Sequence, residues 1–252
     1  RTLNPYDAPN GALCVNFNTI SFKRAGAAYV SAEPQTPLLP LALPRIERSG
    51  LREGRIVLSA HDHEATRYAG ALFQHFLSQA GITSSGRVRL GTVGVQDRLI
   101  YRHLSIYSLD EVIQKLLHFS NNFMANQLLI SAGIADAGAP GTLENGRRAL
   151  SRYLSEVLQM SGFTIAEGSG ISRQNRISAA QLLTLLDAFA PHRHLLREEG
   201  RDHYKTGHLR GVRTRIGYIE SASGGFYRYA LLLNTPGKST HDIMRRLYAV
   251  LK

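Results

Sequence analysis

The chain has 252 residues, and its 30 Lys and Arg against 19 Asp and Glu give a formal net charge of +11. Apolar residues make up 43% of the sequence and charged residues 19%, which excludes an intrinsically disordered chain. No run of 18 apolar residues occurs, so no segment of this sequence could form a membrane-spanning helix. We therefore expect a folded protein with enough apolar residues for a sizeable core.

The basic residues are spread along the chain, without a block of five or six like charges. Proteins that bind nucleic acids usually concentrate their positive charge on one face. We therefore expect a solvated basic surface and no nucleic-acid partner. Arg210, Arg213 and Arg215 then predict a solvated strand face or a contact with an anionic glycan.

Two features of the sequence bear on metal binding. Cys14 is the only cysteine, which excludes an intrachain disulfide and a cysteine-based metal cluster. The segment His61-Asp62-His63-Glu64 contains possible ligands, but no further His or carboxylate follows at ligand spacing. We interpret this segment as the polar start of a helix, whose dipole its carboxylates suit. We expect neither a metal nor an organic cofactor.

The first 60 residues have the pattern of a β-rich segment. Apolar and polar residues alternate over 13–20, and a second strand is expected over 55–59, after a proline-rich loop. From residue 61 the period lengthens to three and four, which predicts a helix over 65–80 that ends at Gly81. We therefore place a boundary near residue 60, between a β-rich accessory segment (1–60) and a second domain (61–252).

The second domain combines helices and strands. Periodicity and capping boxes predict helices over 108–117, from 123 onward, over 150–158, over 178–189 and after Ser239. Strand patterns are expected over 84–107, 203–219 and 226–234, with Gly224-Gly225 as a hairpin turn before the last of them. This order predicts an α+β fold in which helices pack on an antiparallel sheet.

Two short motifs carry the functional inference. Ser120-Asn121-Asn122 interrupts an apolar helical pattern, and such small polar residues compete for backbone hydrogen bonds and favour a turn. Lys205-Thr206-Gly207 opens a predicted strand 85 residues later. Ser-x-Asn alone is weak evidence and Lys-Thr-Gly alone is moderate evidence, but the two in this order indicate a shared site.

This pair resembles the last two motifs of the serine acyl-transferases that recognise penicillin, where Ser-x-x-Lys, Ser-x-Asn and Lys-Thr-Gly follow in that order. Longer stretches narrow the resemblance to the class C low-molecular-mass penicillin-binding proteins, the D-alanyl-D-alanine carboxypeptidase/endopeptidases. The stretches are 16–20, 32–37, 120–125, 168–173 and 205–212. The resemblance covers nearly the whole chain. It implies an incomplete penicillin-binding transpeptidase domain over 61–252, without a cofactor.

The resemblance also implies roles for individual residues. Ser120 and Lys205 would be catalytic, with Ser120 relaying a proton to the leaving D-alanine amine. The residues that would bind substrate are Asn122, Thr206, Gly207, His208 and Ser169. The Lys205 ammonium and the Thr206 hydroxyl would hold the terminal carboxylate of the substrate, and the His208 backbone N–H would donate to the oxyanion. For Ser169 the alternative is that its hydroxyl only satisfies its own loop.

The nucleophile of that family, the Ser of Ser-x-x-Lys, has no counterpart in this sequence. Three positions before the five lysines stand Ile20, Val112, Asp202, Thr235 and Ala249. Only Thr235 has a hydroxyl, and it belongs to a turn rather than a helix start. We therefore expect the C-terminal portion of such a protein, or a relative that has lost its nucleophile, and an inactive chain on its own. Glu167, where the family usually has Asp, and His208, where Ser or Thr is common, are smaller departures.

The leading hypothesis is a peptidoglycan hydrolase that transfers the acyl group of D-alanyl-D-alanine peptides to water through an acyl-serine. Its partners would be peptidoglycan stem peptides, with β-lactams as inhibitors, and its location the bacterial periplasm or extracytoplasmic envelope. The alternative is a non-catalytic protein that binds the same peptides in the same pocket. A basic nucleic-acid binder is a third hypothesis, which a steep salt dependence of nucleic-acid affinity would support.

Overall fold

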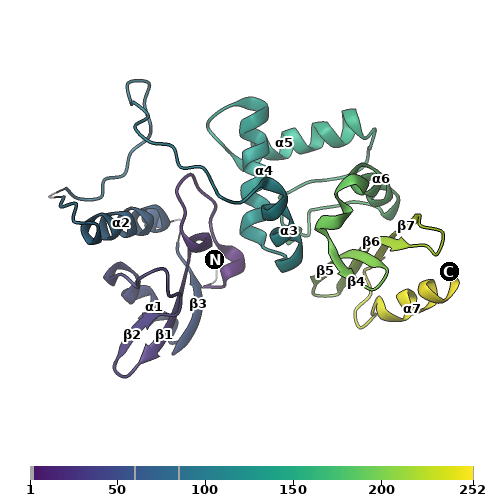
Figure 1. Ribbon diagram of the computed structural model, residues 1–252, viewed down its shortest axis with the longest axis horizontal. Helices are drawn as coiled ribbons and strands as arrows, with labels where there is room; N and C mark the ends of the chain where they lie inside the picture. The colour runs from purple at the N-terminus through teal and green to yellow at the C-terminus, as the bar shows by residue number, and fades with distance from the viewer. Residues whose placement is uncertain (1–2, 60, 85, 252) are drawn as a thin grey trace. The chain divides into compact units, whose positions relative to one another are not determined.

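The computed structural model describes residues 3–59, 61–84 and 86–251 and divides into two compact units, one up to His103 and one from Leu104 onward (Figure 1). Each unit has its own antiparallel sheet and its own helices, which confirms the α+β class. None of the helices in the described part of the chain combines the length and hydrophobicity that a bilayer requires.

The first unit is built on a three-stranded sheet in the order β2-β1-β3. Its strands are β1 (Thr19–Ala25), β2 (Ala28–Ser31) and β3 (Glu53–Val57), and its helices are α1 (Leu43–Ser49) and α2 (Glu64–Gln79). Short 3-10 helices occupy Pro5–Asp7, Asn16–Asn18, Pro40–Ala42 and His61–His63. The strand expected over 55–59 and the helix expected over 65–80 are thus both present.

Helix α2 belongs to the core of the first unit. Its residues Ala65, Tyr68 and Leu72 are buried in one cluster with Phe22 of β1 and Ile56 of β3. The compact units therefore divide after His103, and not near residue 60 where the change of period suggested a boundary. A period change marks where a helix begins, but the packing of its apolar face decides which core it joins.

Two expected strands are absent from the described residues. The alternating segment 13–20 enters a strand only at Thr19, because Asn16, Phe17 and Asn18 have φ values of 49°, 60° and 54°. Left-handed φ values of this kind interrupt a strand. The described residues of the segment 84–107, all but residue 85, form no strand either, and side chains such as Val95 and Ile100 are 100% and 92% exposed.

The described residues of the second unit form the α-helices α3 (Leu109–Phe119), α4 (Asn122–Ala137), α5 (Leu143–Arg152), α6 (Ala179–Phe189) and α7 (His241–Val250). The capping boxes expected at Ser108 and Ser178 both form. Helix α5 starts earlier than expected and runs into a π-helical turn, Tyr153–Val157. It packs on α4 where Gly133 and Gly146 bring the two backbones together, since a Cβ on either glycine would meet the opposite main chain.

The sheet of the second unit has the order β4-β5-β6-β7. Its strands are β4 (Arg197–Glu199), β5 (Asp202–Leu209), β6 (Val212–Glu220) and β7 (Phe226–Leu233). The prediction of a single strand over 203–219 is wrong. The chain reverses at Gly211, whose φ of 78° suits a tight turn, and so forms the two strands β5 and β6. The hairpin turn expected at Gly224-Gly225 is present between β6 and β7.

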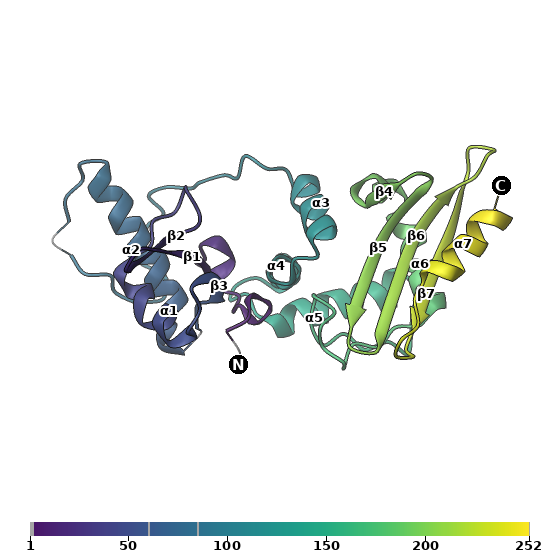
Figure 2. The same cartoon turned by 90° about the horizontal axis from the view of Figure 1, so that it is seen from below.

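Helices cover both faces of this sheet (Figure 2). On one face, Leu186 of α6 packs against Tyr218, with Leu117 of α3 at the margin. On the other face, Met244 of α7 packs against Ile219 and Tyr229. Since side chains alternate along a strand, each residue of β5 is committed to one of these two environments.

A buried carboxylate ties α7 to the sheet. Asp202, the first residue of β5, is 0% exposed. It accepts hydrogen bonds from the Tyr229 and Tyr248 hydroxyls, both at 2.8 Å, and it forms an ion pair with Arg215 Nη2 at 2.7 Å. The Arg215 guanidinium also stacks over the Tyr204 ring at 3.6 Å. The buried charge is therefore paired and hydrogen-bonded on all sides, as a stable interior requires.

Candidate active site

Ser120 lies at the turn between α3 and α4. It is the C-cap of α3 and has a left-handed backbone with φ 52° and ψ 49°. The next helix starts at once, because the Asn121 side chain accepts a hydrogen bond from the Met124 backbone N–H at 3.0 Å. The three polar residues thus end one helix and cap the next, as the interrupted periodicity predicted.

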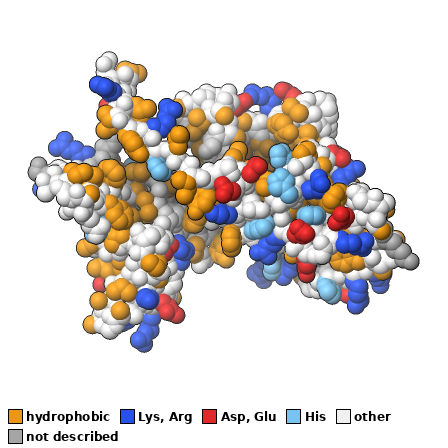
Figure 3. Space-filling view, viewed as in Figure 1, with side chains coloured by type: hydrophobic (Ala, Val, Ile, Leu, Met, Phe, Trp, Pro, Cys, Tyr) orange, Lys and Arg blue, Asp and Glu red, His pale blue; other side chains and the backbone are white. Residues whose placement is uncertain are grey.

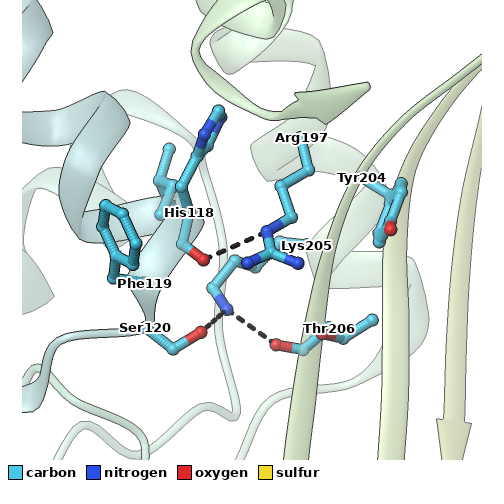
Figure 4. A pocket seen from close by; sticks show the side chains of 8 residues that line it. His118, Phe119, Ser120, Arg197, Tyr204, Lys205 and Thr206 are labelled. Atoms are coloured by element: carbon cyan, nitrogen blue, oxygen red, sulfur yellow. Dashed lines mark hydrogen bonds between the residues drawn. The ribbon is translucent and has the colours of Figure 1, made fainter. Parts of the chain in front are cut away.

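Lys205 reaches Ser120 from the neighbouring sheet. Its register pairs it with Ile216, which places its side chain on the face of the sheet that α6 covers and α3 borders. The Lys205 ammonium donates hydrogen bonds to Ser120 Oγ and, at 2.8 Å, to the Thr206 carbonyl oxygen. Figure 4 shows this convergence of residues that are 85 positions apart in the sequence.

The two side chains share a pocket of about 280 Å³. Its lining comes from the last turn of α3, from β4 and from β5, and consists of Leu117, His118, Phe119, Ser120, Arg197, Tyr204, Lys205 and Thr206. The lining contains two cations and no acidic residue. Burial lowers the pKa of Lys205 from its usual 10.5, and the positive charge of Arg197 lowers it further. The pocket therefore favours an anion and makes its lysine a better proton donor.

The other residues of the Lys-Thr-Gly motif lie on the same edge of the sheet. β4 pairs with β5 only up to Tyr204, so within the described structure β6 alone pairs with β5 from Lys205 onward. Alternation turns the Thr206 and Lys205 side chains to opposite faces, and the Thr206 side chain is exposed. A Cβ at Gly207 would collide with the Thr214 hydroxyl on β6, so the glycine leaves room for that side chain. His208 is exposed.

Ser169 is held within its own loop. Its hydroxyl and its backbone N–H both donate to the Glu167 carboxylate. Ser172 N–H and the Asn175 amide donate to the other oxygen of that carboxylate, at 3.1 and 2.7 Å. Burial alone would raise the pKa of Glu167, but these hydrogen bonds outweigh it and lower the pKa. The geometry agrees with the interpretation that Ser169 satisfies its loop.

The loop is anchored on α4, close in sequence to Ser120. The Gly168 N–H donates to Asn126 Oδ1 at 2.7 Å, and a Cβ on Gly168 would meet the Ala125 carbonyl oxygen at 2.8 Å. Asn122 opens the same helix and is partly exposed. The residues of the two motifs and of the Ser169 loop therefore all belong to the second unit, and among them Ser120, Lys205 and Thr206 line the described pocket.

The described residues contain no group of three or more His, Cys, Asp or Glu side chains that could hold a metal ion. In the His61–Glu64 segment, Glu64 forms an ion pair with Arg45 at 2.6 Å and accepts from the Ser59 N–H at 2.7 Å. The side chain of Asp62 lies outside the described residues. Glu64 thus has a structural role at the start of α2.

Arg197 and His118 were not anticipated from the sequence. The Arg197 Nε donates to the His118 carbonyl oxygen at 3.0 Å and so joins β4 to the last turn of α3. β4 has three residues, all exposed, and its sequence has no hydrophobic pattern from which a strand could be predicted. Figure 3 shows basic and histidine side chains on the face of the second unit drawn there.

Comparison with known proteins identifies the family. Residues 52–199, more than half of the chain, match the D-Ala-D-Ala carboxypeptidase 3 (S13) family. The chain belongs to this family. The match confirms the resemblance to low-molecular-mass penicillin-binding proteins, and it contains Ser120, Asn122 and Ser169 but ends before Lys205.

Several relatives are similar in sequence, among them two D-alanyl-D-alanine carboxypeptidases. The D-alanyl-D-alanine carboxypeptidase DacB of Haemophilus influenzae is 26% identical over 201 residues, which are 70% of this chain and 41% of the relative. A D-alanyl-D-alanine carboxypeptidase of an Actinomadura species is 34% identical over 126 residues, 49% of this chain and 23% of the relative. The matched regions thus span less than half of either relative.

The fold is also that of a solved structure. Penicillin-binding protein 4 (DacB) of Haemophilus influenzae aligns with a TM-score of 0.76 at 18% identity, over 99% of this chain and 69% of the other. The same protein in complex with a β-lactam aligns with a TM-score of 0.64 at 22% identity, over 79% of this chain and 53% of the other.

Proposed function

We propose that the pocket between α3 and β5 is the acyl-transfer site of a serine-type D-alanyl-D-alanine carboxypeptidase/endopeptidase that hydrolyses peptidoglycan. The observation that carries this proposal is the hydrogen bond from the Lys205 ammonium to Ser120 Oγ. A lysine with a lowered pKa beside a hydroxyl forms a path along which a proton can move. Family membership supplies the reaction class.

The reaction is the cleavage of the bond between two D-alanines. A serine oxygen attacks the penultimate carbonyl carbon and the peptide C–N bond breaks, which leaves an acyl-serine and D-alanine; water then releases the acyl group. The Ser120 hydroxyl would give its proton to the leaving amine and would be resupplied by Lys205. The proton lost by the attacking serine would restore Lys205, so that no net proton is gained or lost. None of the five lysines stands three positions after a serine, so the attacking serine would be a residue outside this sequence.

Substrate recognition rests on the free edge of β5 and on the cationic pocket. The terminal carboxylate of the peptide would lie at the edge of β5, where Lys205 from one face and the exposed Thr206 hydroxyl from the other both border the pocket. Gly207 and the His208 backbone N–H would face the reacting carbonyl, and the Asn122 amide would orient the peptide backbone. Ser169 would shape a neighbouring wall through its bond to Glu167.

A binding experiment on the 252-residue chain tests this assignment. We expect diacetyl-L-Lys-D-Ala-D-Ala to bind, and Lys205→Ala to weaken it at least about tenfold, because a charge-assisted hydrogen bond is lost. Ser155→Ala serves as a control that should leave the affinity unchanged, since Ser155 is exposed and its hydroxyl donates to backbone carbonyls of its own helical turn. Equal affinities for the wild type and Lys205→Ala would refute the proposal.

A non-catalytic peptide-binding protein is the second candidate, and the absence of Ser-x-x-Lys favours it. Both candidates predict peptide binding by this chain. They differ in whether a complete site ever releases D-alanine. Covalent labelling of the 252-residue chain by a fluorescent penicillin would show that the chain holds its own nucleophile, and that our assignment of the attacking serine is wrong.

The proposed partners and location follow from the proposed reaction. Peptidoglycan stem peptides would be substrates, and β-lactams would inhibit by mimicking them, as the complex of the Haemophilus influenzae protein with a β-lactam suggests. The substrate lies outside the cytoplasmic membrane, which would place the protein in the periplasm or extracytoplasmic envelope.

A further inference from the structure

The guanidinium of Arg197 shares the pocket with Lys205 but has no part in the proposed reaction. Arg197 lies on β4 directly opposite Tyr204, so it is next to Lys205 along the edge of the sheet. Its Nε donates a hydrogen bond to the His118 carbonyl oxygen at 3.0 Å. Figure 4 shows its two terminal nitrogens on the Lys205 side of the pocket.

The charges around Arg197 are unbalanced. Among the described residues, no carboxylate forms an ion pair with Arg197, and the pocket lining contains no acidic side chain. Two like charges in a partly desolvated pocket repel each other, and Arg197 accordingly lowers the pKa of Lys205. An anion between them would relieve this repulsion and would gain from both.

The fixed direction of the guanidinium limits which anion fits. The Nε bond to His118 holds the plane of the group, and it leaves the terminal nitrogens as a fork of parallel donors. Such a fork matches the two oxygens of a carboxylate, whereas an ammonium acts as a point charge. Because the bond also reaches the last turn of α3, the same side chain holds the Ser120 turn beside the sheet.

We propose that Arg197 is a second carboxylate-binding residue, which selects peptides that present a free carboxylate at the departing residue. This inference rests on the proposed function, because it concerns the same pocket. Lys205 would contribute a point charge and a proton, and Arg197 a planar bidentate contact. Substrate selection and proton transfer would then be carried by different side chains.

The test compares two peptides, diacetyl-L-Lys-D-Ala-D-Ala and its C-terminal amide, in equilibrium binding to the 252-residue chain. The wild type should prefer the carboxylate. Arg197→Gln should reduce this preference about tenfold by lowering affinity for the carboxylate alone. Arg197→Lys keeps the charge without the fork and should recover only part of it. Arg246→Gln removes an exposed positive charge on α7 and should change nothing.

A second readout separates a ligand contact from a structural role. Carbon-13 NMR of the lysine side chains should show a higher Lys205 pKa in Arg197→Gln, since a lowering charge is gone, and an unchanged one in Arg246→Gln. A wild-type preference that survives Arg197→Gln would overturn this inference and leave the proposed function intact. If the wild type binds neither peptide, or both equally, both proposals fail.

Discussion

Replacing Asp202 by alanine tests whether the buried ion cluster holds the second unit together. The carboxylate is fully buried, and it accepts from two tyrosine hydroxyls and from both Nε and Nη2 of Arg215. Asp202→Ala removes every one of these acceptors. It leaves the Tyr229 and Tyr248 hydroxyls without this partner. Arg215 keeps its hydrogen bond to the Tyr229 hydroxyl oxygen at 3.1 Å and, as its remaining carboxylate, the more distant Glu199 at 3.6 Å.

The expected cost follows from the charge that is left behind. The Arg215 side chain is only 15% exposed, so water compensates it poorly. Breaking a buried ion pair from one side typically costs about 3–5 kcal/mol, and the remaining contact with Glu199 favours the lower end. The matched control is Asp242→Ala on α7, whose ion pair with Arg245 is 69–71% exposed. Exposed pairs contribute about 0–1 kcal/mol.

Hydrogen exchange is the suitable assay, because it reports on the second unit separately from the first. Amides of β6 and β7 should exchange at least about a hundredfold faster in Asp202→Ala, since every 1.4 kcal/mol is tenfold in an equilibrium constant. In Asp242→Ala they should change less than about fivefold. Equal protection in the two variants would show that the cluster adds nothing beyond a surface pair, and would refute this reasoning.

Three further predictions concern stability. Glu167→Gln should remove part of the stability that the protein loses on acidification. Because the pKa of Glu167 is lowered in the folded state, the carboxylate stabilises the fold fully above its unfolded pKa of 4.5, and this stabilisation disappears as the pH falls through the folded pKa. Acid denaturation of the wild type and the variant would show the difference. Gly146→Ala should destabilise by about 1–3 kcal/mol in thermal unfolding, because its Cβ would overlap the Leu129 carbonyl group; an unchanged melting temperature would contradict this. Tyr218→Phe should cost about 1–3 kcal/mol in urea denaturation, because the Leu186 carbonyl at the end of α6 loses its buried donor, while a loss well under 1 kcal/mol would mean that water replaces it.

The elements that sequence reasoning found are those with local causes. The capping boxes at Ser108 and Ser178 and the helix over 65–80 depend on residues within a few positions of one another, and all three are present. The strand expected over 84–107 depends instead on a partner that periodicity cannot identify, and its described residues are irregular and mostly exposed. β4 is too short for a pattern and exists because it pairs with the start of β5.

The residues of the site that belong to short sequence motifs could be predicted, and those that the tertiary structure brings in could not. The proximity of Ser120 and Lys205 was inferred from two motifs whose order resembles a known family, and the hydrogen bond between them agrees with that inference. Arg197 belongs to neither motif and reaches the pocket only through the pairing of β4 with Tyr204. A residue brought in by tertiary structure leaves no local signal, so only the coordinates could add it.

The buried cluster and the pocket are linked by the alternation of β5. Asp202 and Lys205 are three positions apart, so they lie on opposite faces of the strand, one under α7 and the other toward α3 and α6. A shift of one residue in the pairing of β5 with β6 would exchange these faces and turn Lys205 away from Ser120. It would also bury the lysine under α7 and move the Asp202 carboxylate away from the tyrosines that surround it. The cost of misplacing that single carboxylate therefore stabilises the register in which the lysine meets the serine.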